Sequence, residues 1–361
     1  MRIGKLKVAA GLARRWLAIA ATPTPSRGPV AVSYGHAQVP GPREQAHGGM
    51  VKFQRMQRRY PHRPTGFNVL YLGSSSLPPD WRQQLWLARR KGAKIVWNQD
   101  GVGYPGWHGP GWEAVNEPLA HALRLADHVF YQSAFCKVGG DRFLGPPRAG
   151  WEILHNAVDT HSFVPGPPER RPLTLLLGGN QYQRYRLESA LRAHALVVCE
   201  RPDARLIVTG RLSWAGDGSE RDDTTRLLVE LGLGDRVELA GTYTQEEAPA
   251  LMRRADILLH TKYNDPCPGI VLEAMACGLP IVYSSSGGVP ELVGEAGHGV
   301  PAPLDWERDH PPAPEDLARA VLDVAERLPE LRAAARARAV EHFDLAPWLE
   351  RHRIVFEELV Q

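Results

Sequence analysis

Residues 264–294 read NDPCPGIVLEAMACGLPIVYSSSGGVPELVG and contain, in order, a turn, a helical pattern, an apolar run and a second turn. The Pro-Cys-Pro-Gly segment interrupts regular structure, and the apolar pattern after it predicts a helix from about Ile270 to Cys277. Gly278 and Pro280 are typical of a helix end, so the apolar run 279–288 predicts a core strand. With the apolar run 255–263 just before it, this stretch predicts the strand–helix–strand unit of an α/β protein.

Similar units recur on both sides of this stretch. Short runs rich in Val, Ile and Leu, each followed by a turn and a helical pattern, predict buried parallel strands at 29–35, 67–75, 93–101, 127–133, 151–159, 172–180, 204–211, 236–242, 255–263 and 279–288. The segment 164–172, with four prolines, separates five of these runs from the other five. The pattern predicts two doubly wound, Rossmann-like domains, 29–165 and 166–345, that face each other across a cleft, with a C-terminal helix at 346–361 packed back on the first.

Charge is distributed unevenly along the 361 residues. The chain has a net charge of +3, but residues 1–63 carry twelve Lys or Arg against the single acid Glu44. This excess predicts an anionic partner such as a membrane surface, whereas nothing in the segment is typical of nucleic-acid binding. Apolar residues recur at helical spacing in residues 1–28, which predicts an amphipathic helix that lies on a membrane or, alternatively, docks on its own domain.

No apolar run reaches the length of a membrane span, and the basic residues near the start interrupt any signal peptide. The four cysteines show neither zinc-ligand nor disulfide spacing, so neither a zinc site nor a disulfide framework is indicated. No D-x-D motif lies in a plausible site, and no metal or other cofactor is expected. We expect a cytoplasmic protein, with peripheral attachment to the inner face of the membrane as a possibility left open by residues 1–63.

Two acids flank the predicted helix of the 264–294 stretch. The helix would begin with free amides at Gly269, Ile270 and Val271, which suit a diphosphate. Glu273, one turn further on, could accept hydrogen bonds from a ribose diol, and Asp265, on the preceding loop, could bind hydroxyls of another ring. The plain alternative is that Glu273 caps the helix and Asp265 stabilises the turn.

The same stretch resembles the acidic-x7-acidic signature of retaining, nucleotide-sugar-dependent glycosyltransferases of family 4. EAMACGLPIV and SGGVPELVG match closely, and other pieces follow in the family's order: YGH…GGMVKF, ADHVFYQSAFCKVGGDRF, LHNAVDTHSFVPG, ARLIVTG and VELAGTYTQEEAPALMRRADILLH. The resemblance spans about residues 30–360 and implies the GT-B fold. It also implies a donor-sugar contact at Asp265 and a ribose contact at Glu273.

Two positions depart from the family pattern on the donor side. The first acid is Asp265 where the family usually has Glu, so its carboxylate is one methylene shorter. The pyrophosphate-facing Arg and Lys of the family correspond to Gly179 and Arg184, with Arg186 close by. A guanidinium binds phosphate oxygens in a fork geometry, so Arg184 and Arg186 could replace the missing pair, or they could be surface residues that begin a helix.

The third departure lies in the first domain. Many relatives have a histidine near the donor sugar where this chain has Asn98, Gln99 or Asp100, and these side chains could contact the sugar or orient the acceptor hydroxyl, or simply form a turn. Gly48 and Gly49, before a basic helical pattern, would allow a diphosphate or acceptor to approach the backbone. That helix is expected to form an acceptor or membrane surface, or else to be an ordinary solvated basic helix.

The resemblance implies metal-independent transfer of a sugar from a nucleoside-diphosphate sugar to a hydroxyl of a glycan or lipid-linked acceptor, with retention, in cell-surface polysaccharide biosynthesis. Catalytic roles fall to Asp265, Arg184 and Asp100. Two alternatives stay open at this point: a catalytically silent relative that binds a nucleotide or glycan, and a sugar-nucleotide epimerase of the same architecture.

Overall fold

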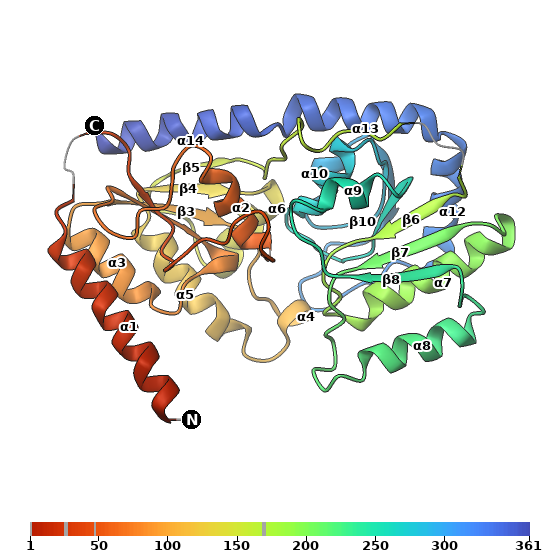
Figure 1. The fold of residues 1–361 in the computed structure, drawn as a ribbon, viewed down its shortest axis with the longest axis horizontal. Helices are drawn as coiled ribbons and strands as arrows, with labels where there is room; N and C mark the ends of the chain where they lie inside the picture. Colours follow the sequence, from red (N-terminus) through yellow and green to blue (C-terminus); the bar gives the residue numbers. More distant parts are fainter. Residues whose placement is uncertain (1, 25–27, 47, 168–170) are drawn as a thin grey trace.

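The structure, a computed structural model, describes residues 2–24, 28–46, 48–167 and 171–361, with the backbone alone at residues 2–9. Residues 168–170 of the predicted linker, and the side chains at the start of the predicted amphipathic helix, lie outside this description. The first half of the chain forms α1 (Arg2–Ala21), β1 (Val32–Ser33), α2 (Gly48–Met56), β2 (Val69–Gly73), the 3-10 helix η1 (Ser74–Ser76), α3 (Trp81–Arg90), β3 (Lys94–Gln99), α4 (Pro105–His108), α5 (Trp112–Leu125), β4 (His128–Tyr131), α6 (Ala134–Phe143) and β5 (Gly150–Ile153) (Figure 1).

The second half forms β6 (Thr174–Leu177), α7 (Arg184–Glu200), β7 (Arg205–Thr209), α8 (Glu220–Glu230), β8 (Val237–Gly241), α9 (Ala248–Met252), β9 (Ile257–His260), α10 (Gly269–Ala276), β10 (Ile281–Ser285), α11 (Val289–Val293), β11 (Gly297–Pro301), α12 (Pro314–Glu326), α13 (Leu328–His342) and α14 (Leu345–Val360). Each of the ten predicted apolar runs overlaps a strand. The strand β11 was not predicted, because its sequence GHGVP has no apolar run.

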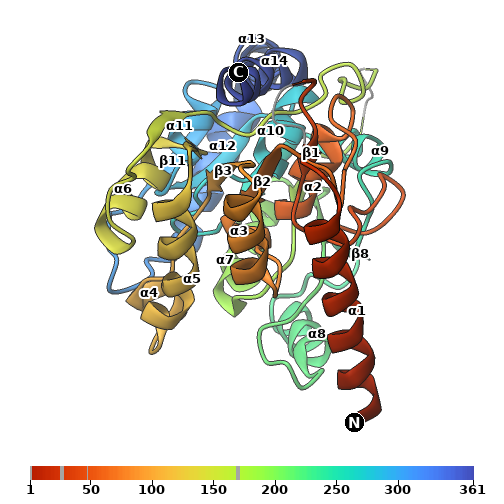
Figure 2. The same ribbon diagram turned by 90° about the vertical axis from the view of Figure 1, so that its left-hand side faces the viewer.

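The strands form two parallel sheets, one in each half of the chain, which confirms the predicted α/β class. The first sheet has the order β1-β2-β3-β4-β5, so strands that are neighbours in the sheet are also neighbours in the sequence. Among the described strands, this order contains no reversal of the kind found in a doubly wound sheet. Alternate residues of its strands enter two cores. One core lies under α3 and α5, and the other lies under α2 and α14 (Figure 2). The C-terminal helix therefore completes one face of this sheet with Leu345, Trp348, Val355 and Phe356.

The second sheet has the order β11-β10-β9-β6-β7-β8. Its strand order runs one way from β6 to β8 and the other way from β9 to β11, so the reversal lies between β6 and β9. In open parallel sheets, loops diverge at such a reversal and leave a crevice beyond the carboxyl ends of the strands. The loops after β6 and β9 contain Gly179 and Asp265, respectively.

The chain crosses between the two sheets twice, at neighbouring points. It leaves the first sheet after β5 and returns between α13 and α14, where the Val158 amide donates a 2.8 Å hydrogen bond to the carbonyl of Phe343. Thr160 also donates a hydrogen bond to Asp344. These bonds join the two crossings, so they form one connection between the domains (Figure 1).

The helix α1 projects from the first domain, and its C-terminal half is docked on α3 (Figure 1). Ile19 is buried in the core under α3, the Trp16 indole donates a 2.8 Å hydrogen bond to Asp80, and Arg15 lies 3.6 Å from the same carboxylate. Leu17, by contrast, is 70% exposed. The C-terminal half of α1 is therefore docked on its own domain, which was the second of the two predictions for this helix. Among the described helices, none combines the length and the apolar character that crossing a bilayer requires.

Candidate active site

The crevice at the β6–β9 reversal faces the carboxyl ends of the first sheet. The loop after β9 contacts the first domain through two main-chain carbonyls. The Ser133 hydroxyl donates a hydrogen bond to the Pro266 carbonyl at 2.8 Å, and the side-chain amide of Asn156 donates one to the Cys267 carbonyl at 2.9 Å. Gly288 also approaches this loop closely, since a Cβ there would lie 2.0 Å from the Pro266 oxygen. The 264–268 turn is therefore held between the two domains.

Asp265 is buried and forms one ion pair, with Lys262 on the same loop, and one hydrogen bond, with His260 at the end of β9. One oxygen lies 3.0 Å from the Lys262 ammonium, and the other lies 3.1 Å from Nε2 of His260. Burial opposes charge on the carboxyl, but these two partners hold the pKa of Asp265 well below its usual range. Burial likewise opposes charge on Lys262, yet Asp265 raises the pKa of Lys262 above its ordinary value. The donor-side loop thus presents a fixed carboxylate–ammonium pair.

Arg186 belongs to this cluster and Arg184 does not. The Arg186 side chain is buried, donates to the carbonyl of Asn180 and lies over the Tyr182 ring, as does the Lys262 ammonium. Its Nε has no hydrogen-bond partner among the described residues. Arg184, at the start of α7, is 59% exposed and lies 3.6 Å from Glu188. Geometry therefore favours Arg186 and Lys262 as the cations beside Asp265.

The turns after β6 and before α10 are closely packed. A Cβ at Gly178 would lie 1.9 Å from Cδ1 of Ile270, so a larger residue there would require the Ile270 side chain to move. Gly179 has a φ of 80°, a left-handed conformation that favours glycine. The α10 amide of Val271 donates to the carbonyl of Pro268 at 3.2 Å. The first two amides of the helix, at Gly269 and Ile270, have no acceptor among the described residues.

Glu273 forms an ion pair with the opposite domain. Its Oε1 lies 2.7 Å from the guanidinium of Arg55, which comes from α2, and both side chains are nearly buried. Arg55 also donates to the carbonyl of Ala157. Burial raises the pKa of Glu273, and Arg55 opposes that increase. The acid that the resemblance assigns to ribose therefore also joins the two domains.

Lys52, one turn before Arg55 on α2, lies at the end of the first sheet. Its ammonium donates to the side-chain oxygen of Asn98, which also accepts a 2.7 Å hydrogen bond from Gln132. The Asn98 amide nitrogen donates to Tyr71 at 3.1 Å. Burial lowers the pKa of Lys52 to about 8, with Asp100 acting in the opposite direction. The basic helix is therefore not simply solvated, because its Lys52 and Arg55 are buried at the cleft.

The other first-domain residues predicted for the site lie near this group. Asp100 is partly exposed at the end of β3, and its carboxylate has no hydrogen-bond partner among the described residues, although its backbone amide donates to Ser74 at 2.8 Å. Gly49 is buried, and a Cβ there would lie 2.8 Å from Oγ of Ser75, so this glycine allows α2 to pack on η1. Gly48 is exposed, with open space where a Cβ would lie.

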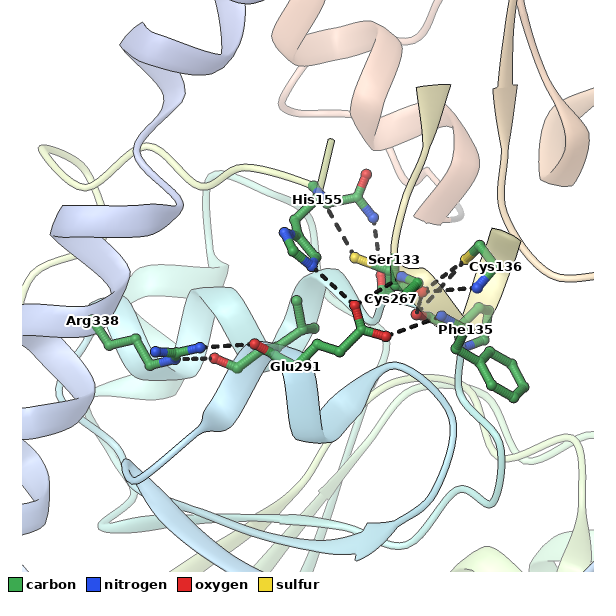
Figure 3. Close-up of polar contacts among 11 residues, drawn as sticks. Ser133, Phe135, Cys136, His155, Cys267, Glu291 and Arg338 are labelled. Carbon is green, nitrogen blue, oxygen red and sulfur yellow. Dashed lines mark hydrogen bonds and ion pairs between the residues drawn. The ribbon is translucent and has the colours of Figure 1, made fainter. Parts of the chain in front are cut away.

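Glu291, on α11 of the second domain, caps the first-domain helix α6 (Figure 3). Its carboxylate accepts hydrogen bonds of 2.8 and 3.0 Å from the amides of Ala134 and Phe135, and His155 lies 3.4 Å away. Burial opposes its charge, but these bonds lower the pKa of Glu291. Ser133 caps the next amide of the same helix. The carboxylate thus joins the domains through the helix dipole.

Replacing Glu291 with alanine is expected to lower the free energy of unfolding by about 1–2 kcal/mol, since it removes a charged cap from α6. Chemical denaturation measures this change. Glu295→Ala is the matched control, because Glu295 is exposed and has no ion-pair partner among the described residues. Equal stability of the two variants would contradict the capping role.

Several site residues were not predicted from the sequence, chiefly Lys262, Arg55 and Trp306. One feature of the sequence could have indicated a role for Lys262: it lies three residues before Asp265, in the loop that follows a strand. Arg55 contacts a residue 218 positions away, and no local pattern indicates that contact. Trp306, after β11, packs against Tyr104 and Phe135 of the other domain.

Comparison with known proteins identifies the family and the fold. The sequence model of the family described as glycosyl transferases group 1 matches residues 158–341, which is half of the chain. The chain is 25% identical over 182 residues to the phosphatidylinositol N-acetylglucosaminyltransferase gpi3 subunit of Schizosaccharomyces pombe, covering 49% of this chain and 38% of that protein. It is 28% identical over 210 residues to the D-inositol 3-phosphate glycosyltransferase of Mycolicibacterium smegmatis, covering 55% and 45%. The matches thus span less than half the length of these relatives.

Solved structures share the fold over most of the chain. Anabaena HepE in complex with UDP-glucose superposes with a TM-score of 0.66 at 17% identity, covering 81% of this chain and 79% of that one. Sucrose-phosphate synthase from Thermosynechococcus elongatus superposes with a TM-score of 0.65 at 18% identity, covering 86% and 77%. The fold is therefore GT-B, and the chain belongs to the glycosyl transferases group 1 family.

Proposed function

We propose that this protein is a retaining, family 4 glycosyltransferase that moves a sugar from a nucleoside-diphosphate sugar to a hydroxyl of a glycan or glycolipid in cell-surface polysaccharide biosynthesis. The observation that carries the proposal is the cluster at the β6–β9 reversal. There, Asp265 and Lys262 form an ion pair on the loop that leads into α10, and the Arg186 guanidinium and the Lys262 ammonium lie over the same Tyr182 ring. Carboxylate, cations and free amides are the groups that bind a sugar joined to a diphosphate.

The donor would lie along the 264–273 stretch. Asp265 binds hydroxyls of the transferred sugar, and Glu273 binds the ribose. The diphosphate lies against the amides of Gly269 and Ile270, with Arg186 and Lys262 as its cationic partners. Arg184 is a weaker candidate than the sequence implied, because its side chain is mostly exposed.

Transfer requires positive potential where the leaving diphosphate gains charge. The acceptor oxygen bonds to the anomeric carbon while the carbon–oxygen bond to the diphosphate breaks, and the acceptor proton passes to the departing phosphate. The products are the glycoside and the nucleoside diphosphate. Buried cations on both sides of the cleft, Lys52 and Lys262, can stabilise that charge with little reorganisation. Metal independence stays a prediction, and assays with EDTA test it.

A thermal-shift screen of nucleotide sugars, followed by assays of donor hydrolysis and transfer, tests the proposal. A donor present at 100 times its dissociation constant should add about 2.7 kcal/mol to the free energy of unfolding. Binding without turnover would indicate the catalytically silent alternative, and an isomerised donor in the absence of any acceptor would indicate an epimerase. No binding of any nucleotide sugar would contradict the proposal.

The second-order rate constant for the donor, kcat/KM, should fall as the pH rises through about 8. Lys52 has its pKa lowered to about 8 by burial, so its positive charge is present below that pH and lost above it. A Lys52→Arg variant keeps the charge at all these pH values and should lose the decline. The pH profile of kcat/KM reports groups of the free enzyme. A decline that is identical in both proteins would exclude Lys52 as its cause.

The comparisons also bear on the acceptor. Two relatives carry names that include phosphatidylinositol or D-inositol 3-phosphate, and the first of these names supports a lipid-linked acceptor. The location that we propose, in the cytoplasm or peripherally on the inner face of the membrane, rests on the sequence. The basic residues in the segment 1–63 would favour an anionic membrane surface. Vesicle co-sedimentation with and without anionic lipid tests this attachment.

A further inference from the structure

A cavity of about 250 Å³ lies between the domains, next to the proposed donor-sugar loop. One end is polar and is lined by Asp100 from the first domain and by Lys262 and Asn264 from the second. The other end is apolar and largely aromatic, lined by Tyr104, Trp107, Val115, Leu119, Phe135 and Trp306. A pocket with this division is suited to a ligand that has one polar and one apolar end.

The polar end offers one unused acceptor that a ligand can reach. The Asp100 carboxylate is partly exposed and has no hydrogen-bond partner among the described residues. Asn264 is 3% exposed, its amide nitrogen donates to the Asp305 carbonyl at 3.1 Å, and its side-chain oxygen, though unpaired among the described residues, is itself buried. The Asp100 carboxylate is therefore the acceptor left for a ligand.

The apolar end is built by the second domain reaching into the first. Trp306 is nearly buried, stacks on Phe135 with ring centroids 5.0 Å apart, and meets Tyr104 edge-on at 4.9 Å. The amide of Gly106 donates to the Trp306 carbonyl at 2.9 Å, and a Cβ at Gly106 would lie 2.8 Å from the backbone of Arg308. This wall is therefore fixed in the closed arrangement.

The cavity does not suit the donor diphosphate. Its charged groups are one carboxylate, which repels a phosphate, and the single ammonium of Lys262. The apolar end is also unfavourable for a polyhydroxylated ring, since each hydroxyl left unpaired there costs about 1–3 kcal/mol. An apolar cavity of about 150 Å³ holds a benzene ring, so this one has room for one ring and a few more atoms but not for two acyl chains.

We infer that this cavity is the acceptor site and that it selects an alcohol whose hydroxyl lies next to a ring-sized apolar group, aromatic or alicyclic. The inference rests on the proposed function and replaces its broad acceptor class with this one. Asp100 accepts the hydrogen bond of the acceptor hydroxyl and orients its oxygen toward the donor sugar. The proton then passes to the departing phosphate, as in the proposed transfer.

Cyclohexanol and inositol form a matched pair of acceptors, because they share the six-carbon ring and differ in hydroxylation. With the nucleotide sugar that gives the largest thermal shift, we expect cyclohexanol and benzyl alcohol to be glycosylated at least about tenfold faster than inositol or glucose. Mass spectrometry of the products and release of the nucleoside diphosphate measure transfer and hydrolysis separately.

Trp107→Ala tests the apolar end, and Trp86→Ala is its control. Trp107 is 40% exposed and lines the cavity, whereas Trp86 is 59% exposed and lies on α3 outside it. The ratio of transfer to hydrolysis should fall about tenfold in Trp107→Ala and stay unchanged in Trp86→Ala, the size of effect expected from losing a few apolar contacts.

The outcomes separate this inference from the proposed function. Hydrolysis of a donor with preference for inositol or glucose, or with neither ring alcohol accepted, would overturn the acceptor assignment and leave the glycosyltransferase proposal standing. An unchanged ratio in Trp107→Ala would overturn it as well. If no nucleotide sugar is bound or hydrolysed, the proposed function fails, and the inference fails with it.

Discussion

Replacing Asp265 with asparagine is expected to reduce sugar transfer by about 10²- to 10³-fold, the range found when one preorganised polar group at a transition state is removed. The side chain keeps its size, but it loses the charge that fixes it between Lys262 and His260. Transfer at saturating donor measures the loss. Retention of more than about a tenth of the activity would contradict a catalytic role for Asp265.

Asparagine is a better substitution than alanine for this test. The carboxylate is the ion-pair partner of the buried Lys262, so alanine leaves that ammonium with neither a counter-charge nor an acceptor, whereas the asparagine oxygen can still accept its hydrogen bond. Removing one partner of a buried pair typically destabilises a protein by about 3–5 kcal/mol. Asp265→Glu is a useful companion, because it restores the longer acid usual in the family.

Local patterns were enough to predict the strands and the turn at 264–269. Each strand of the second sheet except β11 lies in an apolar run, and the helix predicted from Ile270 is observed to begin at Gly269. Both features depend on residues close in the chain. The order of the first sheet depends on which strands pair, and neither run lengths nor turn residues encode that choice.

The two acids of the second domain could be predicted from the sequence, but their ion-pair partners could not. Asp265 and Glu273 stand in a short signature, but their partners differ in sequence distance. Lys262 lies three residues from Asp265, whereas Arg55 lies 218 residues from Glu273. A partner so distant in the sequence is determined by how the two domains face each other. The sequence pattern therefore placed Arg55 in a basic helix but did not indicate its contact with Glu273.

The structure also changes the interpretation of the basic N-terminal part. Arg55 is used in an ion pair with the second domain, and Arg15 and Arg58 lie within ion-pair distance of Asp80 and Asp159. Part of the positive charge that predicted a membrane partner is therefore neutralised within the molecule. A membrane-facing surface would have to rely on the basic residues that have no such acid nearby.

Replacing Arg55 with alanine is expected to be among the most destabilising single changes on α2. The variant leaves Glu273 buried without its 2.7 Å partner, which should lower the free energy of unfolding by about 3–5 kcal/mol. Arg58→Ala, in the turn directly after α2, is the matched control. Its ion pair with Asp159 is also 2.7 Å long, but the Arg58 side chain is 55% exposed, so its loss should cost at most about 1 kcal/mol.

Denaturant unfolding of the two variants distinguishes a buried interdomain pair from an ordinary surface pair of the same length. A double variant, Arg55→Met with Glu273→Met, removes both charges and should recover most of the stability lost in Arg55→Ala, because no unpaired charge is left in the interface. The double variant should nevertheless bind nucleotide sugar poorly, since Glu273 is the proposed ribose contact. If Arg55→Ala costs no more than Arg58→Ala, then the cleft is open to water at Glu273, and the closed arrangement of the domains does not depend on this pair.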